Sequence, residues 1–359
     1  MRDHAELETL PTDGSRASAT PDGPLLEVRD LRVEFPTDEG TLKAVDGVSF
    51  SIDRHQTLGI VGESGSGKTV TSLAILGLLP KSAKITGDIL FDGLSLLGRK
   101  EKHLQGIRGN RIAMVFQDAL ASLNPVYKVG DQIAEAIDVH NELAKHETRE
   151  RVHDLLDLVG IANPRERAGL YPHEYSGGMR QRAMIAMAIA NDPDLLIADE
   201  PTTALDVTIQ AQVLEVLERI QERTRSSIML ITHDLGVVAG VAQDVMVMYA
   251  GRAVETGSVD DIFYAPRHPY TLGLLASLPR IDRRREGTKL HRIKGQPPSL
   301  VFVPPGCPFH PRCEFARTPE PCATERPELA PVGGARRSAC HFSAELEGLT
   351  PESLRETAS

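Results

Sequence analysis

The sequence predicts an α/β fold with a parallel central sheet, an antiparallel β-lobe, an inserted helical subdomain and a cysteine-bearing C-terminal extension. Three observations predict it: short apolar runs separated by helical stretches, an alternating apolar pattern near the N-terminus, and four cysteines that all lie beyond residue 300. Short apolar runs fit strands covered on both faces, whereas alternation fits strands with one solvated face.

Composition limits the classes of protein that the chain can belong to. It has 359 residues, of which 41% are hydrophobic and 25% charged, close to the globular average. Its 40 Lys and Arg against 50 Asp and Glu give a net charge of −10, so we expect no nucleic-acid partner. No apolar run reaches the roughly 18 residues of a spanning helix, and no signal-peptide pattern begins the chain. We therefore expect a cytoplasmic protein.

The strands of the two predicted sheets differ in their patterns. Alternation from Leu26 onward predicts the antiparallel β-lobe. The apolar runs at 58–62, 195–198 and 228–231 predict buried parallel strands of the central sheet.

Shifts in composition predict the domain boundaries. Residues 1–24 are rich in Pro, Gly, Ser and Thr and are expected to form a flexible leader. The main domain is expected at 25–265, with a helical subdomain at about 118–190. Pro, Arg and Cys accumulate at 266–342, which we expect to be a separate C-terminal appendage, followed by a flexible tail at 343–359.

A glycine-rich loop follows the first apolar run. The segment GESGSGKT (62–69) stands between a strand pattern and a helix pattern, the context in which G-x-x-x-x-G-K-[ST] binds phosphates. Its backbone N–H groups can point inward, its Lys would meet the β- and γ-phosphates, and its Thr would bind Mg²⁺. The expected ATP ligands here are Gly62, Ser64, Gly65, Ser66, Gly67, Lys68, Thr69 and Val70.

Two further strands end in residues that could act on a phosphate. LLIADE (195–200) ends in Asp199, expected to hold Mg²⁺, and Glu200, expected to polarise the attacking water as general base. His233 follows the next strand, at the edge where ligands of open α/β sheets gather, and is expected to contact the γ-phosphate. The expected catalytic residues are Lys68, Glu200 and His233.

A second anion site is predicted at SGGMRQR (176–182), where two glycines begin a helix. Its expected ATP ligands are Ser176, Gly177, Gly178 and Gln181. Because one chain then carries two half-sites, we expect a head-to-tail dimer in which this segment closes over nucleotide held by the other subunit. ATP binding would drive closure and hydrolysis would reopen the dimer.

From Leu26 to Thr256 these motifs together resemble the ATP-binding cassette (ABC) ATPases, which have a P-loop NTPase fold. The resemblance implies that Phe35 stacks on adenine and that Asp206 belongs to the D-loop. It also implies that Gln117 senses Mg²⁺ and the membrane partner, so that the expected Mg²⁺ ligands are Thr69, Gln117 and Asp199.

Other segments resemble one subfamily, the ATPase subunits of oligopeptide, dipeptide and nickel importers. They are SLNPVYKVGDQI, HPYTLGLLASLPR, IKGQPPSL and GCPFHPRC. The resemblance implies ATP hydrolysis that energises import, a second and often non-identical ATPase subunit, two membrane permease subunits and an extracytoplasmic binding protein. It implies a peripheral position on the cytoplasmic face of the membrane.

Three alternatives to peptide import stay open at this point. The cargo could be nickel or another small solute, since substrate contacts belong to the permease and the binding protein. A soluble ABC ATPase of DNA repair or translation would share the nucleotide motifs, although the coiled-coil arms and double cassettes of those proteins do not occur here. A scaffold without hydrolysis is opposed by the presence of Glu200 and His233.

The four cysteines suggest a metal site. Their C-x5-C-x8-C-x17-C spacing lacks the close pair of structural zinc sites and suits a 4Fe-4S cluster, which resemblance to the peptide-importer tail also favours. Zinc stays open, with His310 or His341 as a replacement ligand. The expected role is to hold together a Pro-rich segment that is poor in apolar residues. The expected ligands are Cys307, Cys313, Cys322 and Cys340.

Overall fold

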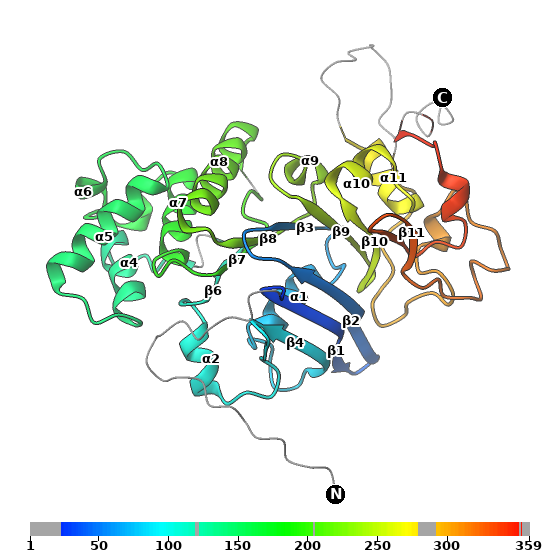
Figure 1. Ribbon diagram of the computed structural model, residues 1–359, viewed down its shortest axis with the longest axis horizontal. Helices are drawn as coiled ribbons and strands as arrows, with labels where there is room; N and C mark the ends of the chain where they lie inside the picture. Colours follow the sequence, from blue (N-terminus) through cyan, green and yellow to red (C-terminus); the bar gives the residue numbers. More distant parts are fainter. Residues whose placement is uncertain (1–22, 119–121, 204, 279–291, 352, 354–359) are drawn as a thin grey trace, which may run out of the picture.

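A computed structural model of the chain has two β-sheets, with a helical subdomain at one end and the C-terminal extension at the other (Figure 1). It describes residues 23–118, 122–203, 205–278, 292–351 and 353. Most of the predicted leader and the end of the predicted tail lie outside these residues.

The smaller sheet is the predicted antiparallel β-lobe. Its order is β2-β1-β4-β5, and β1 pairs with both β2 and β4 in antiparallel register. The alternating apolar residues of β1, among them Val28, Leu31 and Val33, are buried, which confirms the pattern. The strands are β1 (Leu26–Thr37), β2 (Gly40–Ile52), β4 (Lys84–Phe91) and β5 (Leu94–Ser95).

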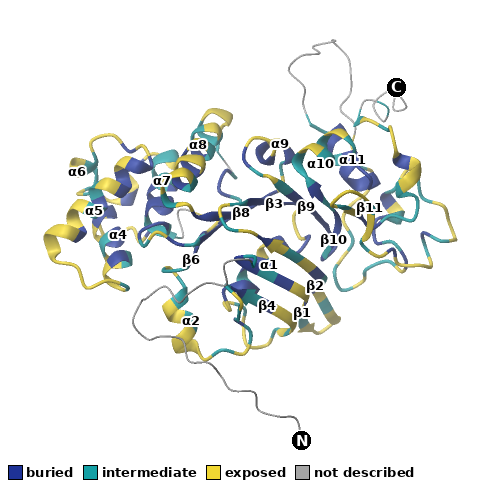
Figure 2. Cartoon of the chain, viewed as in Figure 1, coloured by how far each residue is buried: buried dark blue, intermediate teal, exposed yellow. Residues whose placement is uncertain are grey.

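The larger sheet has the order β11-β12-β10-β9-β3-β8-β7-β6 and contains the predicted parallel strands. Every residue of β3, β7 and β8 is buried, as Figure 2 shows for the middle of the sheet. This confirms that the short apolar runs are strands covered on both faces. Its parallel strands are β3 (Thr57–Val61), β6 (Ile112–Val115), β7 (Leu195–Asp199), β8 (Ser227–Thr232) and β9 (Asp244–Tyr249).

Helices follow most of these strands. Between β6 and β7 the chain forms the helical subdomain, whose α5 buries Val152, Leu155 and Leu156 on one face. The helices up to the end of the parallel sheet are α1 (Lys68–Ile75), α2 (Glu101–Ile107), α4 (Val129–Asp138), α5 (Lys145–Leu158), α6 (Pro164–Arg167), α7 (Gly177–Ala188), α8 (Val207–Thr224) and α9 (Leu235–Val238). None of the helices in the described part of the chain is long and apolar enough to cross a membrane.

The C-terminal extension, which the sequence analysis expects to be a separate appendage, pairs with the larger sheet. Strand β12 pairs with β10 through Glu255 with Ser338 and Thr256 with Arg337, and β11 adds a further strand. Sequence patterning could not show this because β11 and β12 are short and mostly exposed. The elements are β10 (Arg252–Ser258), α10 (Val259–Tyr264), α11 (Pro269–Ala276), β11 (Ala330–Gly333) and β12 (Arg336–Ser338).

Candidate functional site

The glycine-rich loop connects β3 to α1 in a conformation that requires glycine. Gly65 and Gly67 have φ values of 78° and 99°, in the left-handed region. A Cβ atom on Gly67 would lie 2.4 Å from the carbonyl oxygen of Ala44, and one on Gly62 would lie 2.2 Å from that of Met248. The loop is therefore packed tightly against two neighbouring segments.

Lys68, the first residue of α1, folds back over this loop. Its Nζ donates hydrogen bonds to the carbonyl oxygens of Gly62 at 2.7 Å and Glu63 at 3.1 Å. Its side chain is 4% exposed, and this burial lowers the pKa of Lys68 although the carboxylates of Glu200 and Asp199 oppose the shift. The cation is thus held at a fixed place beside the loop.

Ser66 of the same loop has a buried hydroxyl with no hydrogen-bond partner among the described residues. Buried polar groups in folded proteins are nearly always hydrogen-bonded, and the exceptions call for an explanation. A ligand with acceptor oxygens in the loop would satisfy this donor.

Two carboxylates at the end of β7 face the loop. Thr69 donates from Oγ1 to Oδ1 of Asp199 at 3.2 Å. Asp199 is 2% exposed, and its burial raises the pKa of the carboxyl, an effect that the hydrogen bond from Thr69 opposes. The next residue, Glu200, has a φ of 48°, a conformation that non-glycine residues adopt at a cost and that concentrates at functional sites.

Glu200 is the centre of a polar network. Its Oε2 accepts hydrogen bonds from Thr203 at 2.7 Å and from Gln117 at 3.3 Å, and lies 3.2 Å from Nδ1 of His233. Its Oε1 lies 3.8 Å from Nζ of Lys68. The structure therefore brings together the three residues predicted to be catalytic, which come from α1 and from the ends of β7 and β8.

These groups open into one cavity of about 720 Å³. Its walls include the predicted residues Phe35, Ser64, Gly65, Ser66, Gly67, Lys68, Thr69, Val70, Gln117, Glu200 and His233. They also include residues that the sequence analysis did not single out, namely Leu42, Ala44, Glu63 and Leu300. Gly62 and Asp199 contact this wall through their hydrogen bonds with Lys68 and Thr69.

The segment predicted to form the second anion site lies in the helical subdomain. Ser176 caps α7, and its Oγ accepts a hydrogen bond from the backbone N–H of Met179 at 3.3 Å. Ser176 and Gly177 are exposed. Gln181 is buried, and its Nε2 has no partner among the described residues.

Asp206 caps the neighbouring helix α8. Its Oδ1 accepts a hydrogen bond from the backbone N–H of Ile209 at 3.0 Å. A Cβ atom on Gly178 would lie 2.9 Å from Cγ2 of Ile209, so the two helix N-termini are packed closely. Of the described residues that line the cavity above, none belongs to this second set, which comprises Ser176, Gly177, Gly178, Gln181 and Asp206.

Comparison with known proteins identifies the family. Residues 45–203 match the model of the ABC transporter family, and residues 254–322 match that of the oligopeptide/dipeptide transporter C-terminal region. The dipeptide transport ATP-binding protein of Bacillus subtilis is 55% identical over 291 residues, which cover 80% of this chain and 86% of that protein. The chain belongs to the ABC transporter ATP-binding proteins.

Other relatives of this ABC ATP-binding protein differ in length. The oligopeptide transport ATP-binding protein of Haemophilus influenzae is 46% identical over 322 residues, covering 90% of this chain and 98% of that protein. The protein of the same name from Mycobacterium bovis is 51% identical over 318 residues, 88% of this chain. The chain spans only about half of that mycobacterial protein, 52% of its length.

Solved structures support the ABC cassette fold. A dimeric ATP-binding cassette described as a post-hydrolysis state bound to ADP and Pi matches with a TM-score of 0.59 at 23% identity, over 65% of this chain and 98% of that one. The cbiO1 subunit of a Clostridium perfringens ABC transporter complex matches with a TM-score of 0.57 at 28% identity, over 67% and 90%. The predicted fold class is confirmed for the cassette.

Leu300 shows that the C-terminal extension of this ABC protein takes part in the cavity wall. Its carbonyl oxygen accepts a hydrogen bond from the backbone N–H of Lys43 in β2 at 3.2 Å. The sequence analysis used the surrounding segment IKGQPPSL only as a mark of the subfamily. Nothing in its pattern indicates that it folds back across the β-lobe.

The four cysteines line one small cavity of about 20 Å³, together with His310 and His341. All four are free thiols, and burial raises the pKa of Cys313 to about 12 and that of Cys340 to about 11. Throughout the described ranges, no group of three or more His, Cys, Asp and Glu side chains is arranged to hold a metal ion. The cavity itself has room for about one water molecule. For both reasons the geometry does not confirm an iron–sulfur or zinc site.

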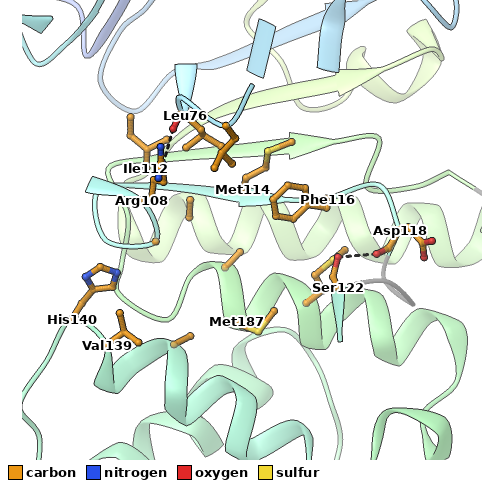
Figure 3. A pocket seen from close by; sticks show the side chains of 16 residues that line it. Leu76, Arg108, Ile112, Met114, Phe116, Asp118, Ser122, Val139, His140 and Met187 are labelled. Carbon is orange, nitrogen blue, oxygen red and sulfur yellow. Dashed lines mark hydrogen bonds between the residues drawn. The ribbon is translucent and has the colours of Figure 1, made fainter. Parts of the chain in front are cut away.

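A second large cavity, of about 620 Å³, lies between the end of α1, β6 and the helical subdomain (Figure 3). It is mostly apolar, and its lining includes three large apolar side chains that are exposed: Leu78 at 43%, Phe116 at 43% and Val139 at 70%. Phe116 directly precedes Gln117, so this cavity adjoins the network around Glu200 along the chain.

Proposed function

We propose that this ABC protein binds and hydrolyses ATP in the 720 Å³ cavity. The observation that carries the proposal is the position of Glu200, whose carboxylate lies beside the Lys68 ammonium and is contacted by Gln117 and His233. The unpartnered Ser66 hydroxyl supports phosphate binding in the adjoining loop. Phe35 and Leu300 supply apolar walls that suit the base and sugar.

Mg²⁺ would be held by the predicted ligands Thr69, Gln117 and Asp199. Hydroxyl, amide and carboxylate oxygens are the ligands that Mg²⁺ prefers, and the hydrogen bond from Thr69 to Asp199 already brings two of these groups together. The ion, when bound, neutralises charge on the β- and γ-phosphate oxygens.

Glu200 would act as the general base. It accepts a proton from water while the water oxygen bonds to the γ-phosphorus and the bond to the β–γ bridging oxygen breaks. Lys68 would balance charge on the phosphate oxygens, and His233 would orient the carboxylate and contact the γ-phosphate. The hydrogen bond from the Thr203 hydroxyl would orient the carboxylate of Glu200 for this role.

The position of the second half-site, in which Ser176, Gly177 and Asp206 are exposed, supports a head-to-tail dimer. Ser176, Gly177, Gly178, Gln181 and Asp206 lie away from the cavity of their own chain, so they would serve nucleotide held by a second subunit. We propose that this second subunit is a related but non-identical ATPase chain, and that ATP binding closes the dimer.

We further propose that hydrolysis energises import of dipeptides or oligopeptides. The C-terminal family match and the names of the relatives above support peptides over nickel. The partners would be two membrane permease subunits, which receive their substrate from an extracytoplasmic binding protein. The chain would then lie peripherally on the cytoplasmic face of the membrane.

The 620 Å³ apolar cavity supports the permease contact. A helix from a cytoplasmic loop of a permease subunit would bury Leu78, Phe116 and Val139, since exposed apolar surfaces of this kind are typical of protein interaction sites. A permease helix bound there would contact Phe116, and the neighbouring Gln117 would connect this contact to Glu200.

For the four cysteines we propose a 4Fe-4S cluster, with zinc as the alternative. Their free thiols facing a single cavity support it, although the cavity would have to widen. Iron, acid-labile sulfide and zinc would be measured in protein purified without oxygen. About four irons per chain, lost in Cys313→Ser, would support the cluster; metal-free protein with full ATP binding would contradict both metals.

The importer assignment is tested by affinity purification of the tagged chain from detergent-solubilised membranes, followed by mass spectrometry. We expect two permease subunits and a second ATPase subunit to copurify. Recovery of the chain without permeases would contradict the transport role while leaving the ATPase role intact.

A further inference from the structure

The C-terminal extension contacts the phosphate loop through a two-pronged ion pair. Arg312 donates from Nη1 to Oε2 of Glu63 at 2.5 Å and from Nη2 to Oε1 of Glu63 at 2.9 Å. Glu63 is the second residue of the loop and lines the 720 Å³ cavity. Paired N–H donors on one carboxylate form a strong contact that also fixes orientation.

Other contacts hold the Arg312 side chain in place beside Glu63. Its side chain is 5% exposed, its Nε donates to the carbonyl oxygen of Lys294 at 3.0 Å, and its Nη1 lies 3.4 Å from Oη of Tyr249. The guanidinium carbon lies 5.8 Å from the centre of the Tyr249 ring. A buried cation with this many fixed contacts acts as a rigid support.

Tyr270 of α11 holds the backbone of the same loop residue. Its Oη accepts a hydrogen bond from the backbone N–H of Glu63 at 2.9 Å. The ring is fully buried and packs against Tyr249 and Phe309, with ring centres 4.7 Å and 5.3 Å apart. The extension therefore fixes both the side chain and the N–H of Glu63, while Lys68 binds its carbonyl oxygen.

We propose that Arg312 and Tyr270 are positioning residues that hold the phosphate loop in its ATP-binding shape, so that the C-terminal extension sets the affinity for ATP. The inference rests on the proposed ATP site. Without Arg312, Glu63 would present an uncompensated carboxylate beside the triphosphate, and like charges at short range repel strongly. The loop would also lose one of its two supports from the extension.

The test compares binding of MgATP to the full-length protein by equilibrium dialysis. Arg312→Met is expected to raise the Kd roughly tenfold, the effect of losing a hydrogen-bonded charge. In hydrolysis assays KM should rise similarly while kcat changes less than about threefold, because ground-state and transition-state binding suffer alike. Arg317→Met is the matched control, since Arg317 is also paired in the extension, with the exposed Glu345, and should leave the Kd unchanged.

A double variant separates the charge of Glu63 from the support that Arg312 gives the loop. Glu63→Gln combined with Arg312→Met removes the repelling charge but leaves the loop without its support from Arg312, so the Kd should lie below that of Arg312→Met and above that of the wild type. Arg312→Lys keeps the positive charge with a single donor group, so its Kd should lie between those of the wild type and Arg312→Met. If Arg312→Met does not fold, Arg312→Lys provides the test.

Two results would overturn the proposal. One is an Arg312→Met or Arg312→Lys protein with a lower melting temperature and a Kd within about twofold of wild type, as a purely structural role predicts. The other is a double variant that binds ATP as tightly as the wild type, because the loop would then keep its shape without Arg312. Failure of the wild-type protein to bind MgATP would instead refute the ATP site itself.

Discussion

The Lys68 ammonium lies 3.8 Å from Oε1 of Glu200, which connects the phosphate loop to the carboxyl end of β7. Both side chains are largely buried, at 4% and 12% exposure. Oε1 of Glu200 favours the charged form of Lys68, because a carboxylate stabilises a nearby ammonium. Oε2 of Glu200 contacts Thr203, Gln117 and His233 instead. The two oxygens of Glu200 thus face different partners.

The first prediction concerns Glu200→Gln. The amide keeps the shape of the side chain but cannot accept a proton from water, so hydrolysis should slow at least about a hundredfold. MgATP should still bind, because Lys68 and the loop are unchanged. Steady-state phosphate release and equilibrium binding measure the two effects, and near-normal turnover would refute the role of Glu200.

The second prediction uses the unpartnered hydroxyl of Ser66. Ser66→Ala removes a buried group that costs free energy when unpaired, so the melting temperature should stay equal or rise slightly. The Kd for ATP should rise roughly fivefold, as expected for one lost hydrogen bond of about 1 kcal/mol.

Ser226→Ala is the matched control for Ser66→Ala. Ser226 is also buried, but its Oγ donates to the carbonyl oxygen of Pro193 at 2.5 Å. Its replacement should lower the melting temperature and leave ATP binding unchanged. The same pattern of effects in both variants would contradict a phosphate contact by Ser66.

The sequence analysis identified most of the nucleotide site because its residues lie in short contiguous motifs at strand ends. Lys68, Glu200 and His233 each come after an apolar run that forms a buried parallel strand. Parallel strands place their carboxyl ends at one edge of the sheet, so the residues that follow them lie close together. Leu300 and Arg312 could not be found in this way. Leu300 reaches the cavity wall and Arg312 reaches the phosphate loop because the extension folds back onto the cassette. Contacts between residues so far apart in the sequence leave no periodic pattern in it.

The third prediction tests the apolar cavity as the permease site. Val139→Glu places a charge at a position that is 70% exposed, so folding and ATP binding should be unaffected. The desolvation of a carboxylate in an apolar contact should reduce permease copurification at least about tenfold.

Tyr264→Glu is the control for Val139→Glu. Tyr264 is another exposed apolar residue, 82% accessible, and it lies on α10 among the C-terminal elements. This variant should copurify with permeases as the wild type does. Equal recovery with both variants would exclude the cavity as the contact.

The fourth prediction concerns pH and Glu255 of β10. Glu255 is 1% exposed, and burial raises the pKa of its carboxyl from 4.5 to about 7, although hydrogen bonds from the backbone N–H groups of Arg267 and His268 oppose the shift. Between these two pKa values the folded protein keeps a proton that the unfolded chain has lost. The contribution of Glu255 to stability is therefore complete below pH 4.5 and declines as the pH rises to about 7.

Glu255→Gln removes this titration. The free energy of unfolding of the wild type relative to the variant should fall by roughly 3 kcal/mol between pH 4.5 and pH 7, as measured by urea unfolding. The neighbouring His268, whose pKa burial lowers to about 3, has the opposite pH dependence, but it is present in both proteins and cancels in the difference. A difference that stays constant across this range would show that Glu255 is already ionised in the folded protein, and that the hydrogen bonds to it outweigh the cost of its burial.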